Sequence, residues 1–376
     1  MKIGILHLSD IHIEDSKDWI LSKHEKIAQA VIGTWEELTT LFVVISGDIA
    51  NKGFSEQYML AYDFLTSIKE YIQKQSSAKV YFIVAPGNHD CDFSSEKYDF
   101  KARDSFINTV TKDPSIIEKG DSIYKGCLSV QRNFFSFIKK LETQIEYPSN
   151  PEIFYQIDLN DGVQKFCFNI FNTAWLSQIN ERQGGLVFPN HLINVDIEKL
   201  ASCAFSMSVF HHPDNWLDSN NAIEFKKLTE ENSDIILSGH EHHREVFFKK
   251  QVESQVETQI IKADALQERN RPESSSFNLI IVELTSKKQK LFRFKWKEVE
   301  YKKMGKDNDW QDFIRNRFLQ SQSLYLLPDF EKYVNTLDSL PQHNRKRSVT
   351  LEDFFIPPKL YVNLSLELKF KCKKLC

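Results

Sequence analysis

The stretch YFIVAPGNHD, residues 81–90, joins an apolar run to a glycine turn that carries Asn88, His89 and Asp90. A short apolar run bounded by Pro and Gly predicts a buried strand that ends in a tight turn. Two helical stretches precede it, near Trp19 to Leu38 and around residues 60–72, and each follows an apolar run. The first ninety residues therefore predict an α/β fold in which polar side chains follow buried strands.

Four other short runs place polar side chains directly after an apolar stretch. They are SDIHI (9–13), SGDIA (46–50), FHHP (210–213) and SGHEH (238–242). Together the five runs hold seven potential metal ligands: Asp10, His12, Asp48, Asn88, His211, His240 and His242. Gly47, Gly87 and Gly239 each precede a ligand, and glycine permits the positive φ or close backbone approach that such a turn needs. We expect the five runs to meet along one edge of a sheet.

The ligand set mixes carboxylate and amide oxygen atoms with imidazole nitrogen atoms. Such a set suits Mn²⁺, Fe²⁺ or Zn²⁺ better than calcium or a thiolate-bound structural zinc. Two such ions about 3.5–4 Å apart can bind phosphoryl oxygens, lower the pKa of a bridging water and stabilise the leaving oxygen. The pattern therefore predicts two divalent metal ions and a phosphoester substrate.

The order D-x-H, GD, GNHD, H and GHxH resembles the calcineurin-like metallophosphoesterase superfamily over roughly residues 1 to 285. SDIHI with GNHD is closer to the branch of cyclic-nucleotide phosphodiesterases, glycerophosphodiesterases and DNA-repair exonucleases. Protein phosphatases of the superfamily instead carry GDxxDRG and GNHE, where this chain has GDIANKG and GNHD. The resemblance implies hydrolysis of phosphodiester bonds by attack of a metal-bound hydroxide.

The resemblance also implies a role for each site residue. Asp10, His12 and His242 would hold the first ion, Asn88, His211 and His240 the second, and Asp48 would bridge the two. His89 would contact the phosphate and protonate the leaving group, since imidazole titrates near neutral pH. Asp90 would then orient His89. At FHHP either histidine could coordinate; the resemblance favours His211, which leaves His212 beside the ligands or the substrate.

The remaining histidines and cysteines carry simpler expectations. His7 lies inside the first apolar run and is expected to be a packed strand residue, and His243 is expected to be a solvated neighbour of the site. The six cysteines show no CxxC spacing, so reduced thiols are expected.

The second half of the chain predicts mainly strands. Strand-like runs lie at 153–159, 165–171, 204–210, 234–238, 245–250, 258–264 and 277–284. Several follow one another without a helix, which indicates hairpins. We expect two packed sheets with helices outside, and the resemblance implies the same arrangement: a four-layer α/β/β/α sandwich of two mixed sheets.

The domain organisation is expected to be a catalytic domain over residues 1–298 and a lysine-rich C-terminal extension or linker over 299–376. Residues 91–150 form an insertion that either caps the site or is a surface excursion without a role. A helix is expected from Asp309 to about Leu337. LEDFFIPPKL loosely resembles linkers that join effector domains to NTPase modules in bacterial defence proteins, which would imply an NTPase partner.

Composition constrains the function only broadly. The chain has 376 residues, 41% of them hydrophobic, which is enough for a sizeable core. The net charge of −4 neither demands nor excludes a nucleic-acid partner. No run approaches the length of a membrane span and the N-terminus is strand-like, so we expect a cytoplasmic protein without membrane contact.

Two other functions stay open from the sequence. A metal-dependent nuclease acting as an effector domain would use a basic groove, and KLFRFKW interleaves lysine with aromatic residues that could stack on bases. The same alternation fits an ordinary edge strand with one buried face, which we favour. A non-catalytic binding module is less favoured, because it would have lost a ligand or His89 and neither is missing.

Overall fold

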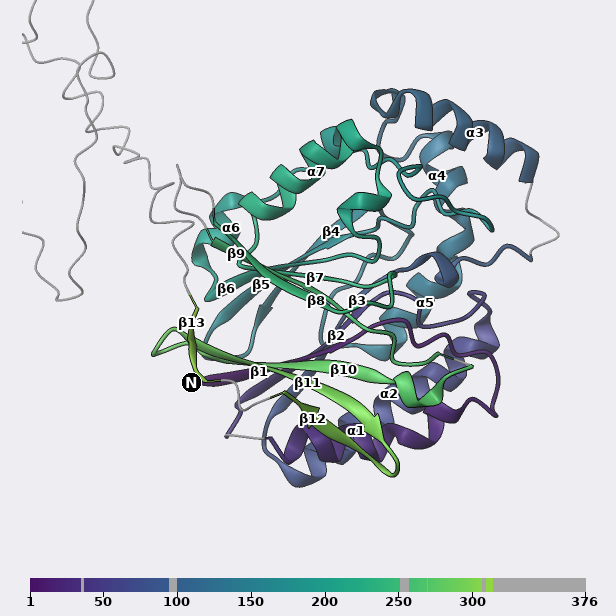
Figure 1. The fold of residues 1–376 in the computed structure, drawn as a ribbon. Helices are drawn as coiled ribbons and strands as arrows, with labels where there is room; N and C mark the ends of the chain where they lie inside the picture. Colours follow the sequence, from purple (N-terminus) through teal and green to yellow (C-terminus); the bar gives the residue numbers. More distant parts are fainter. Residues whose placement is uncertain (35–36, 95–99, 251–256, 269, 306–308, 314–376) are drawn as a thin grey trace, which may run out of the picture. The chain divides into compact units, whose positions relative to one another are not determined.

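The chain folds around two β-sheets that lie face to face (Figure 1). A computed structural model describes residues 1–34, 37–94, 100–250, 257–268, 270–305 and 309–313. The first sheet has the strand order β12-β11-β10-β1-β2-β3, and β13 pairs with β11. Its strands are β1 (Lys2–Leu8), β2 (Thr40–Ser46), β3 (Lys79–Ala85), β10 (Ser276–Glu283), β11 (Lys288–Lys297), β12 (Glu300–Met304) and β13 (Gln311–Asp312). β1, β2 and β3 are parallel, whereas β10 is antiparallel to β1, so the sheet is mixed.

The second sheet has the strand order β4-β5-β6-β7-β9-β8. Its strands are β4 (Phe154–Asn160), β5 (Lys165–Phe171), β6 (Phe205–Val209), β7 (Ile235–Ser238), β8 (Glu245–Lys250) and β9 (Glu257–Lys262). β5, β6, β7 and β9 are parallel, and β4 and β8 form antiparallel edges. All seven strand-like runs expected between residues 153 and 284 are therefore strands, and two consecutive pairs, β4–β5 and β8–β9, are antiparallel as expected of hairpins.

Helices cover the outer face of each sheet (Figure 1). α1 (His24–Ile32) and α2 (Ser55–Gln75) lie on the first sheet, and α6 (Ile197–Ser202) and α7 (Ser219–Glu231) lie on the second. Short 3-10 helices are η1 (Trp19–Lys23), η2 (Asn88–Asp90), η3 (Pro114–Ile116), η4 (Ser129–Gln131), η5 (Asn190–Leu192), η6 (Asp214–Trp216) and η7 (Pro272–Ser274). The four-layer α/β/β/α sandwich of two mixed sheets is thus confirmed.

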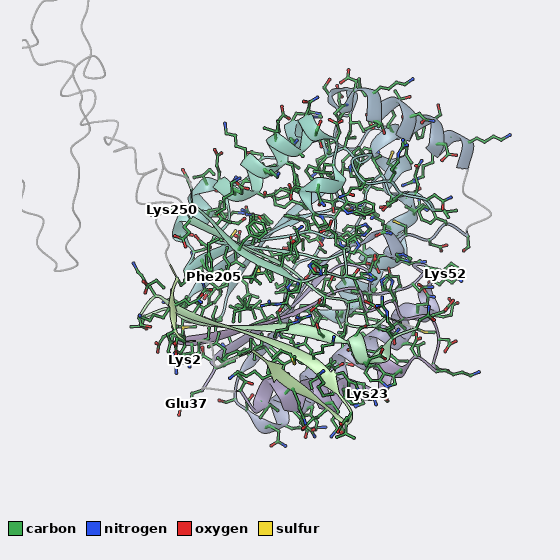
Figure 2. All side chains as sticks on the ribbon, in the orientation of Figure 1. Lys2, Lys23, Glu37, Lys52, Phe205 and Lys250 are labelled. Carbon is green, nitrogen blue, oxygen red and sulfur yellow. The ribbon has the colours of Figure 1, made fainter. Side chains whose placement is uncertain are left out.

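Aromatic side chains fill the space between the two sheets. The ring of Phe42 in β2 lies 5.0 Å from the rings of both Phe166 and Phe168 in β5. Phe205 of β6, labelled in Figure 2, lies 6.2 Å from Phe42 and is fully buried. Each such ring removes a large apolar area from water, so this layer holds the two sheets at a fixed separation.

The described part of the 91–150 insertion is helical and packs on the body of the fold. It contains α3 (Phe100–Lys112), α4 (Ser122–Leu128) and α5 (Arg132–Leu141). In α5, Phe137 stacks on Tyr58 of α2 at 4.9 Å. Val110 of α3 and Cys127 of α4 belong to a second buried cluster that includes Trp175. The insertion is therefore anchored to both halves of the sandwich.

We had expected the strand that contains KLFRFKW to lie at the edge of a sheet. This expectation is wrong. β11 pairs with β10 on one side and with β12 and β13 on the other, so the sheet continues past this strand. The predicted alternation is present, because Phe292, Phe294 and Trp296 are buried while Arg293 and Lys295 between them are partly exposed.

Two further expectations concern the C-terminal region and the membrane. The helix expected from Asp309 is wrong at its start, because Gln311–Asp312 forms β13; its continuation from residue 314 and LEDFFIPPKL lie outside the described residues. None of the helices described is both long enough and apolar enough to cross a bilayer.

Candidate metal centre

The seven predicted ligands meet at one edge of the sandwich. Asp10 and His12 follow β1, Asp48 follows β2, Asn88 follows β3, His211 follows β6, and His240 and His242 follow β7. Three of these strands belong to the first sheet and two to the second. Because all five strands are parallel to a neighbour and end at the same side, their carboxyl ends bring the ligands of both sheets together.

Asp10, His12 and His242 form one group of donor atoms. Oδ1 of Asp10 lies 3.2 Å from Nε2 of His242 and 3.8 Å from Nε2 of His12. The two imidazole nitrogens are 3.4 Å apart. Oδ2 of Asp10 accepts hydrogen bonds from Oγ of Ser9 at 2.6 Å and from the amide of His240 at 3.1 Å. Oδ1 is buried without a hydrogen-bond partner among the described residues, so it is the oxygen that a cation would use.

Asn88, His211 and His240 form the second group. Oδ1 of Asn88 lies 2.9 Å from Nε2 of His211 and 3.1 Å from Nδ1 of His240, and these two nitrogens are 3.1 Å apart. Nδ1 of His211 lies 2.8 Å from the carbonyl oxygen of Ser46. A carbonyl can only accept, so Nδ1 carries the hydrogen and Nε2 presents its lone pair to the group in neutral imidazole.

Asp48 lies between the two groups. Its Oδ2 is 3.1 Å from Nε2 of His211 and 3.8 Å from Nε2 of His12. Its Oδ1 instead accepts a hydrogen bond from the amide of His89 at 2.8 Å. One oxygen is therefore held by the backbone and the other is shared by both groups, which is the position required of a bridging ligand.

The donor atoms have the separations expected around metal ions. Two ligands about 2.1 Å from one ion, at tetrahedral to octahedral angles, are roughly 3.0–3.4 Å apart. Within the two groups the shortest donor separations are 2.9–3.4 Å. Two imidazole lone pairs at such distances repel unless a proton or a cation lies between them. The residues therefore fit two divalent ions, and their assignment as ligands remains a prediction.

Backbone strain is concentrated at these residues. Among the described residues, eight other than glycine have positive φ, and five of them are predicted ligands. They are Asp10 (φ 54), His12 (φ 51), Asp48 (φ 56), His240 (φ 72) and His242 (φ 52). A left-handed conformation costs free energy for an L-residue and persists where the surroundings over-determine it, often at functional sites.

The three predicted glycines allow close approach to the ligands. A Cβ on Gly87 would collide with Oδ1 of Asp48, and one on Gly239 would collide with Ser9 and Oδ2 of Asp10. Gly47 has φ +100, and its Cβ would meet the ring of His211. Any larger side chain at these positions must displace a predicted ligand or the group that orients it.

The electrostatics favour bound cations. Burial acts to raise the pKa of Asp48, but His211 beside it outweighs burial and holds this pKa well below its usual range. Burial acts to lower the pKa of His211, but the Asp48 carboxylate outweighs it and raises the pKa to about 10. Burial, with His212 and His211 nearby, lowers the pKa of His240 to about 2. The site thus combines ionised carboxylates and a neutral His240 with a His211 that holds a proton at neutral pH, and binding of a divalent ion at His211 would release that proton.

His89 lies next to the two groups and is exposed. Its ring centroid is 4.6 Å from that of His12, and its Nδ1 is 2.8 Å from the carbonyl oxygen of Asn51. Because a carbonyl can only accept a hydrogen bond, Nδ1 carries a hydrogen, and Nε2 remains available for proton transfer. His89 is therefore oriented for the predicted role at the edge of the site.

We had expected Asp90 to orient His89, but the hydrogen bonds of its carboxylate go to backbone amides and to the hydroxyl of Tyr58. Its carboxylate is buried and accepts hydrogen bonds from the amides of Ile49 and Ala50 at 3.1 and 3.0 Å and of Gly87 at 2.9 Å. Burial and the neighbouring Asp48 raise the pKa of Asp90 to about 6. Asp90 instead ties the turn after β2 to the turn after β3, and this positions their ligands.

Comparison with known proteins agrees with this geometry. Residues 3–244 match the family described as calcineurin-like phosphoesterase. The chain belongs to this family. It is 23% identical over 260 residues to the uncharacterized metallophosphoesterase-like protein YydB of Bacillus subtilis (strain 168), which is 64% of this chain and 49% of that protein. The chain therefore spans about half the length of that relative.

The chain is also similar to solved structures at low identity. One is Vacuolar Protein Sorting 29 from Cryptosporidium parvum, at 12% identity and a TM-score of 0.34, over 81% of this chain and 96% of that one. Another is the phosphopantetheinyl hydrolase PptH from Mycobacterium tuberculosis, at 12% identity and a TM-score of 0.33, over 73% and 91%.

Sequence reasoning missed Glu181, which lies beside the donor groups. Oε2 of Glu181 lies 3.0 Å from Nε2 of His212, whose ring centroid is 4.4 Å from that of His240. Burial acts to raise the pKa of Glu181, but His212 outweighs it and lowers this pKa. Glu181 follows no strand directly and matches no motif, so nothing local marked it. His212, the open alternative to His211, contacts Glu181 and also has a ring nitrogen within 4.8 Å of those of His211 and His240, so the choice between the two histidines remains a prediction.

Proposed function

We propose that this phosphoesterase hydrolyses phosphodiester bonds with two divalent ions and with His89 as the proton donor. The observation that carries the proposal is the position of Asp48. Its Oδ2 is shared by the two donor groups, and its Oδ1 binds the amide of His89 at 2.8 Å. The carboxylate of Asp48 would therefore bridge the two ions and, at the same time, hold the backbone of His89, the proposed proton donor.

Each group of side chains has a defined task in this proposal. Asp10, His12 and His242 would hold one ion and Asn88, His211 and His240 the other, with Asp48 shared. When bound, the ions would polarise the phosphoryl oxygens and lower the pKa of a water. His89, held through Nδ1 by the Asn51 carbonyl, would give the proton on Nε2 to the departing oxygen. It must therefore enter the reaction doubly protonated.

The charge beside His89 supports a diester rather than a monoester. A phosphomonoester carries up to two negative charges near neutral pH, whereas a diester carries one. Lys52 stands where the protein phosphatases of the family have an arginine. Its Nζ is 3.2 Å from Oε1 of Glu14, which partly neutralises it, and a lysine cannot form the bidentate contact of arginine. The second charge of a monoester thus lacks a dedicated partner.

Nuclease activity is the second candidate, and the positions of the aromatic residues in β11 weaken it. Phe292, Phe294 and Trp296 were the aromatic residues expected to stack on bases, but all three are buried in the first sheet. They belong to the core, where no base can reach them. A nucleic-acid substrate would have to be held by other surfaces, and the assay below includes it as an outcome.

The test is a substrate panel with the Mn²⁺-supplemented full chain. It contains bis-p-nitrophenyl phosphate, p-nitrophenyl phosphate, cyclic nucleotides, and single- and double-stranded DNA and RNA. We expect kcat/KM at least about tenfold higher for the diester than for the monoester, and loss of both activities after removal of metal. A preference for the monoester, or full activity in the metal-free protein, would contradict the proposal. Cleavage of nucleic acid above the small diesters would favour the nuclease.

A further inference from the structure

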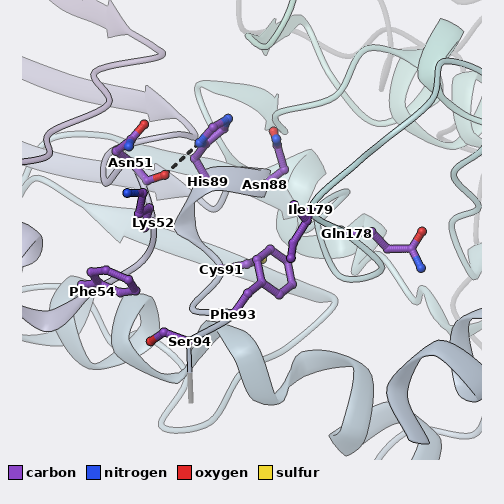
Figure 3. A pocket seen from close by; sticks show the side chains of 10 residues that line it. All are labelled: Asn51, Lys52, Phe54, Asn88, His89, Cys91, Phe93, Ser94, Gln178 and Ile179. Atoms are coloured by element: carbon purple, nitrogen blue, oxygen red, sulfur yellow. Dashed lines mark hydrogen bonds between the residues drawn. The ribbon is translucent and has the colours of Figure 1, made fainter. Parts of the chain in front are cut away.

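A pocket opens beside His89 and Asn88 (Figure 3). Its volume is about 390 Å³, within the range of roughly 300–1,000 Å³ that small-molecule sites occupy. It is lined by Asn51, Lys52, Phe54, Asn88, His89, Cys91, Phe93, Ser94, Gln178 and Ile179. Because Asn88 and His89 belong both to this lining and to the metal centre, the pocket and the centre are continuous.

The pocket has an apolar interior, and none of the described residues that line it is acidic. Phe54, Phe93 and Ile179 supply its large apolar side chains, and Figure 3 shows the Phe93 ring beside Ile179. Ile179 is 73% exposed, so its side chain is accessible to a ligand in the pocket. The lining therefore suits an uncharged organic group better than a second phosphate.

The two chain segments that form the pocket are tied to each other. Gly53 has φ +68, and a Cβ there would lie 2.6 Å from the carbonyl carbon of Cys91 and 2.7 Å from the amide of Asp92. Nδ2 of Asn133 donates to the carbonyl of Gly53 at 2.9 Å and to Oδ2 of Asp92 at 3.1 Å. Asn133 belongs to α5 of the insertion, so the insertion fixes the spacing of Phe54 and Phe93 before any ligand arrives.

Gln178 and Ile179 form the remaining side of the pocket, and they are connected to the metal centre through Glu181. Ile179 lies two residues before Glu181, which holds Nε2 of His212 at 3.0 Å. The amide of Gln178 also donates to Oε1 of Glu181 at 3.3 Å. The contacts of Glu181 therefore fix the position of Ile179 relative to the donor groups. A ligand whose phosphate lies at the donor groups would meet Ile179 at a fixed distance.

We propose that this pocket binds a planar aromatic group esterified to the phosphate, on the side of the leaving oxygen. The inference rests on the proposed function, because it takes the phosphate to lie at the donor groups. His89 both lines the pocket and contacts the ring of His12 in the first donor group, so the group whose oxygen His89 protonates would enter the pocket. Phe54 and Phe93 offer ring contacts to a planar group that an alkyl chain does not use. The substrate class is thus a small aromatic or nucleoside phosphoester.

The experiment measures binding, without turnover, to the Mn²⁺-loaded full chain by isothermal titration calorimetry. The probes are phenylphosphonate against methylphosphonate, and AMP against ribose 5-phosphate. Each pair shares its anionic group and differs in the aromatic ring. We expect wild type to bind the aromatic member of at least one pair about tenfold more tightly or better, which corresponds to about 1.4 kcal/mol. A preference in the first pair indicates an aryl ester, and one in the second a nucleotide.

Ile179→Ala and Phe93→Ala should each reduce that preference to about threefold or less, with little change for methylphosphonate or ribose 5-phosphate. Ile223→Ala is the matched control, because Ile223 is 67% exposed on α7 and does not line the pocket. Ile179 is exposed enough that its truncation leaves the fold intact even where Phe93→Ala lowers stability. Equal binding within both pairs, or a preference that survives Ile179→Ala, overturns the pocket assignment alone. Failure of all four probes to bind overturns this inference, whereas failure to hydrolyse the diester in the substrate panel overturns the proposed function.

Discussion

Nε2 of His211 lies 3.1 Å from Oδ2 of Asp48, although the two residues come from different sheets. Nδ1 of the same ring is 2.8 Å from the carbonyl oxygen of Ser46, two residues before Asp48. The end of β2 therefore holds both nitrogens of a ligand that β6 supplies. This double contact fixes the position of the second donor group relative to the first, and it makes the relative placement of the two sheets a determinant of the site.

Asp48→Asn tests the shared ligand. The amide keeps the shape of the side chain but removes the charge and turns one oxygen into a donor, which cannot serve two cations. We expect bound Mn²⁺ to fall from about two ions per chain to one or fewer, and turnover of bis-p-nitrophenyl phosphate to fall at least about 10³-fold. Metal content after dialysis is measured by inductively coupled plasma mass spectrometry and turnover by initial rates.

Asp63→Asn serves as the control for that substitution. Asp63 is exposed on α2 and belongs to none of the residue groups that could hold a metal ion, so both readouts should match wild type. Near-normal hydrolysis by Asp48→Asn once Mn²⁺ is added would contradict the two-ion assignment.

His89→Ala tests the proton donor. The ring of His89 contacts that of His12, and a nitrogen of His89 lies within 4.8 Å of donor atoms of His12 and Asp48, but Nδ1 is held by the Asn51 carbonyl. Because the predicted role of His89 is proton transfer and not metal binding, metal content should stay unchanged. General acid catalysis contributes about 10²–10⁴-fold, and its share grows as the leaving group becomes more basic. We expect kcat to fall about 10²-fold or more for an alkyl leaving group and much less for p-nitrophenolate. Equal losses for both leaving groups would remove the proton-donor role.

Gly87→Ala tests the close approach at the turn after β3. Gly87 has φ −110, a conformation that alanine adopts freely, so the only conflict is between the new methyl group and Asp48. We expect a loss of bound Mn²⁺ and of at least about tenfold in turnover, because a misplacement of about 1 Å at a catalytic group can cost 10²-fold.

Gly120→Ala is the matched comparison for Gly87→Ala. Gly120 has φ +81 but no heavy atom within 4 Å of the added Cβ, so its alanine variant carries backbone strain without a collision. It should lose about 1 kcal/mol of stability in urea unfolding and keep its metal. If the Gly120 variant lost metal as readily as the Gly87 variant, general destabilisation would explain both.

The sequence predicts those parts of the site that follow from strand ends. A buried strand followed by Gly and a polar residue is a local pattern, so Asp48 and Asn88 could be placed at the sheet edge without coordinates. The partner of His89 could not, because a backbone carbonyl such as that of Asn51 has no sequence signature. Glu181 was missed for a related reason: it reaches His212 across 31 residues through a loop without periodicity. Likewise, nothing in KLFRFKW indicates that two later strands cover its outer side.

His7 provides a pH-dependent test of the core beside the site. It is fully buried in β1, its Nε2 lies 2.9 Å from Oγ of Ser46, and its Nδ1 has no hydrogen-bond partner among the described residues. Burial lowers its pKa from 6.5 to about 3, although Asp10 acts in the opposite direction. Between these two values the unfolded chain binds a proton that the folded chain does not, so the contribution of His7 to stability falls as the pH falls below about 6.5.

At about pH 5 this linkage amounts to roughly 2 kcal/mol, and above about pH 7.5 it vanishes. His7→Gln lacks the titration, so the free energy of unfolding of the variant relative to wild type should shift by about 2 kcal/mol in its favour between these pH values. Urea unfolding of the metal-free proteins measures both quantities. His243→Gln is the control, because His243 is exposed and its substitution should leave the difference from wild type independent of pH. If the free energies of unfolding of wild type and His7→Gln depended on pH in the same way, His7 would bind its proton equally well in the folded and the unfolded chain, and the lowered pKa would be contradicted.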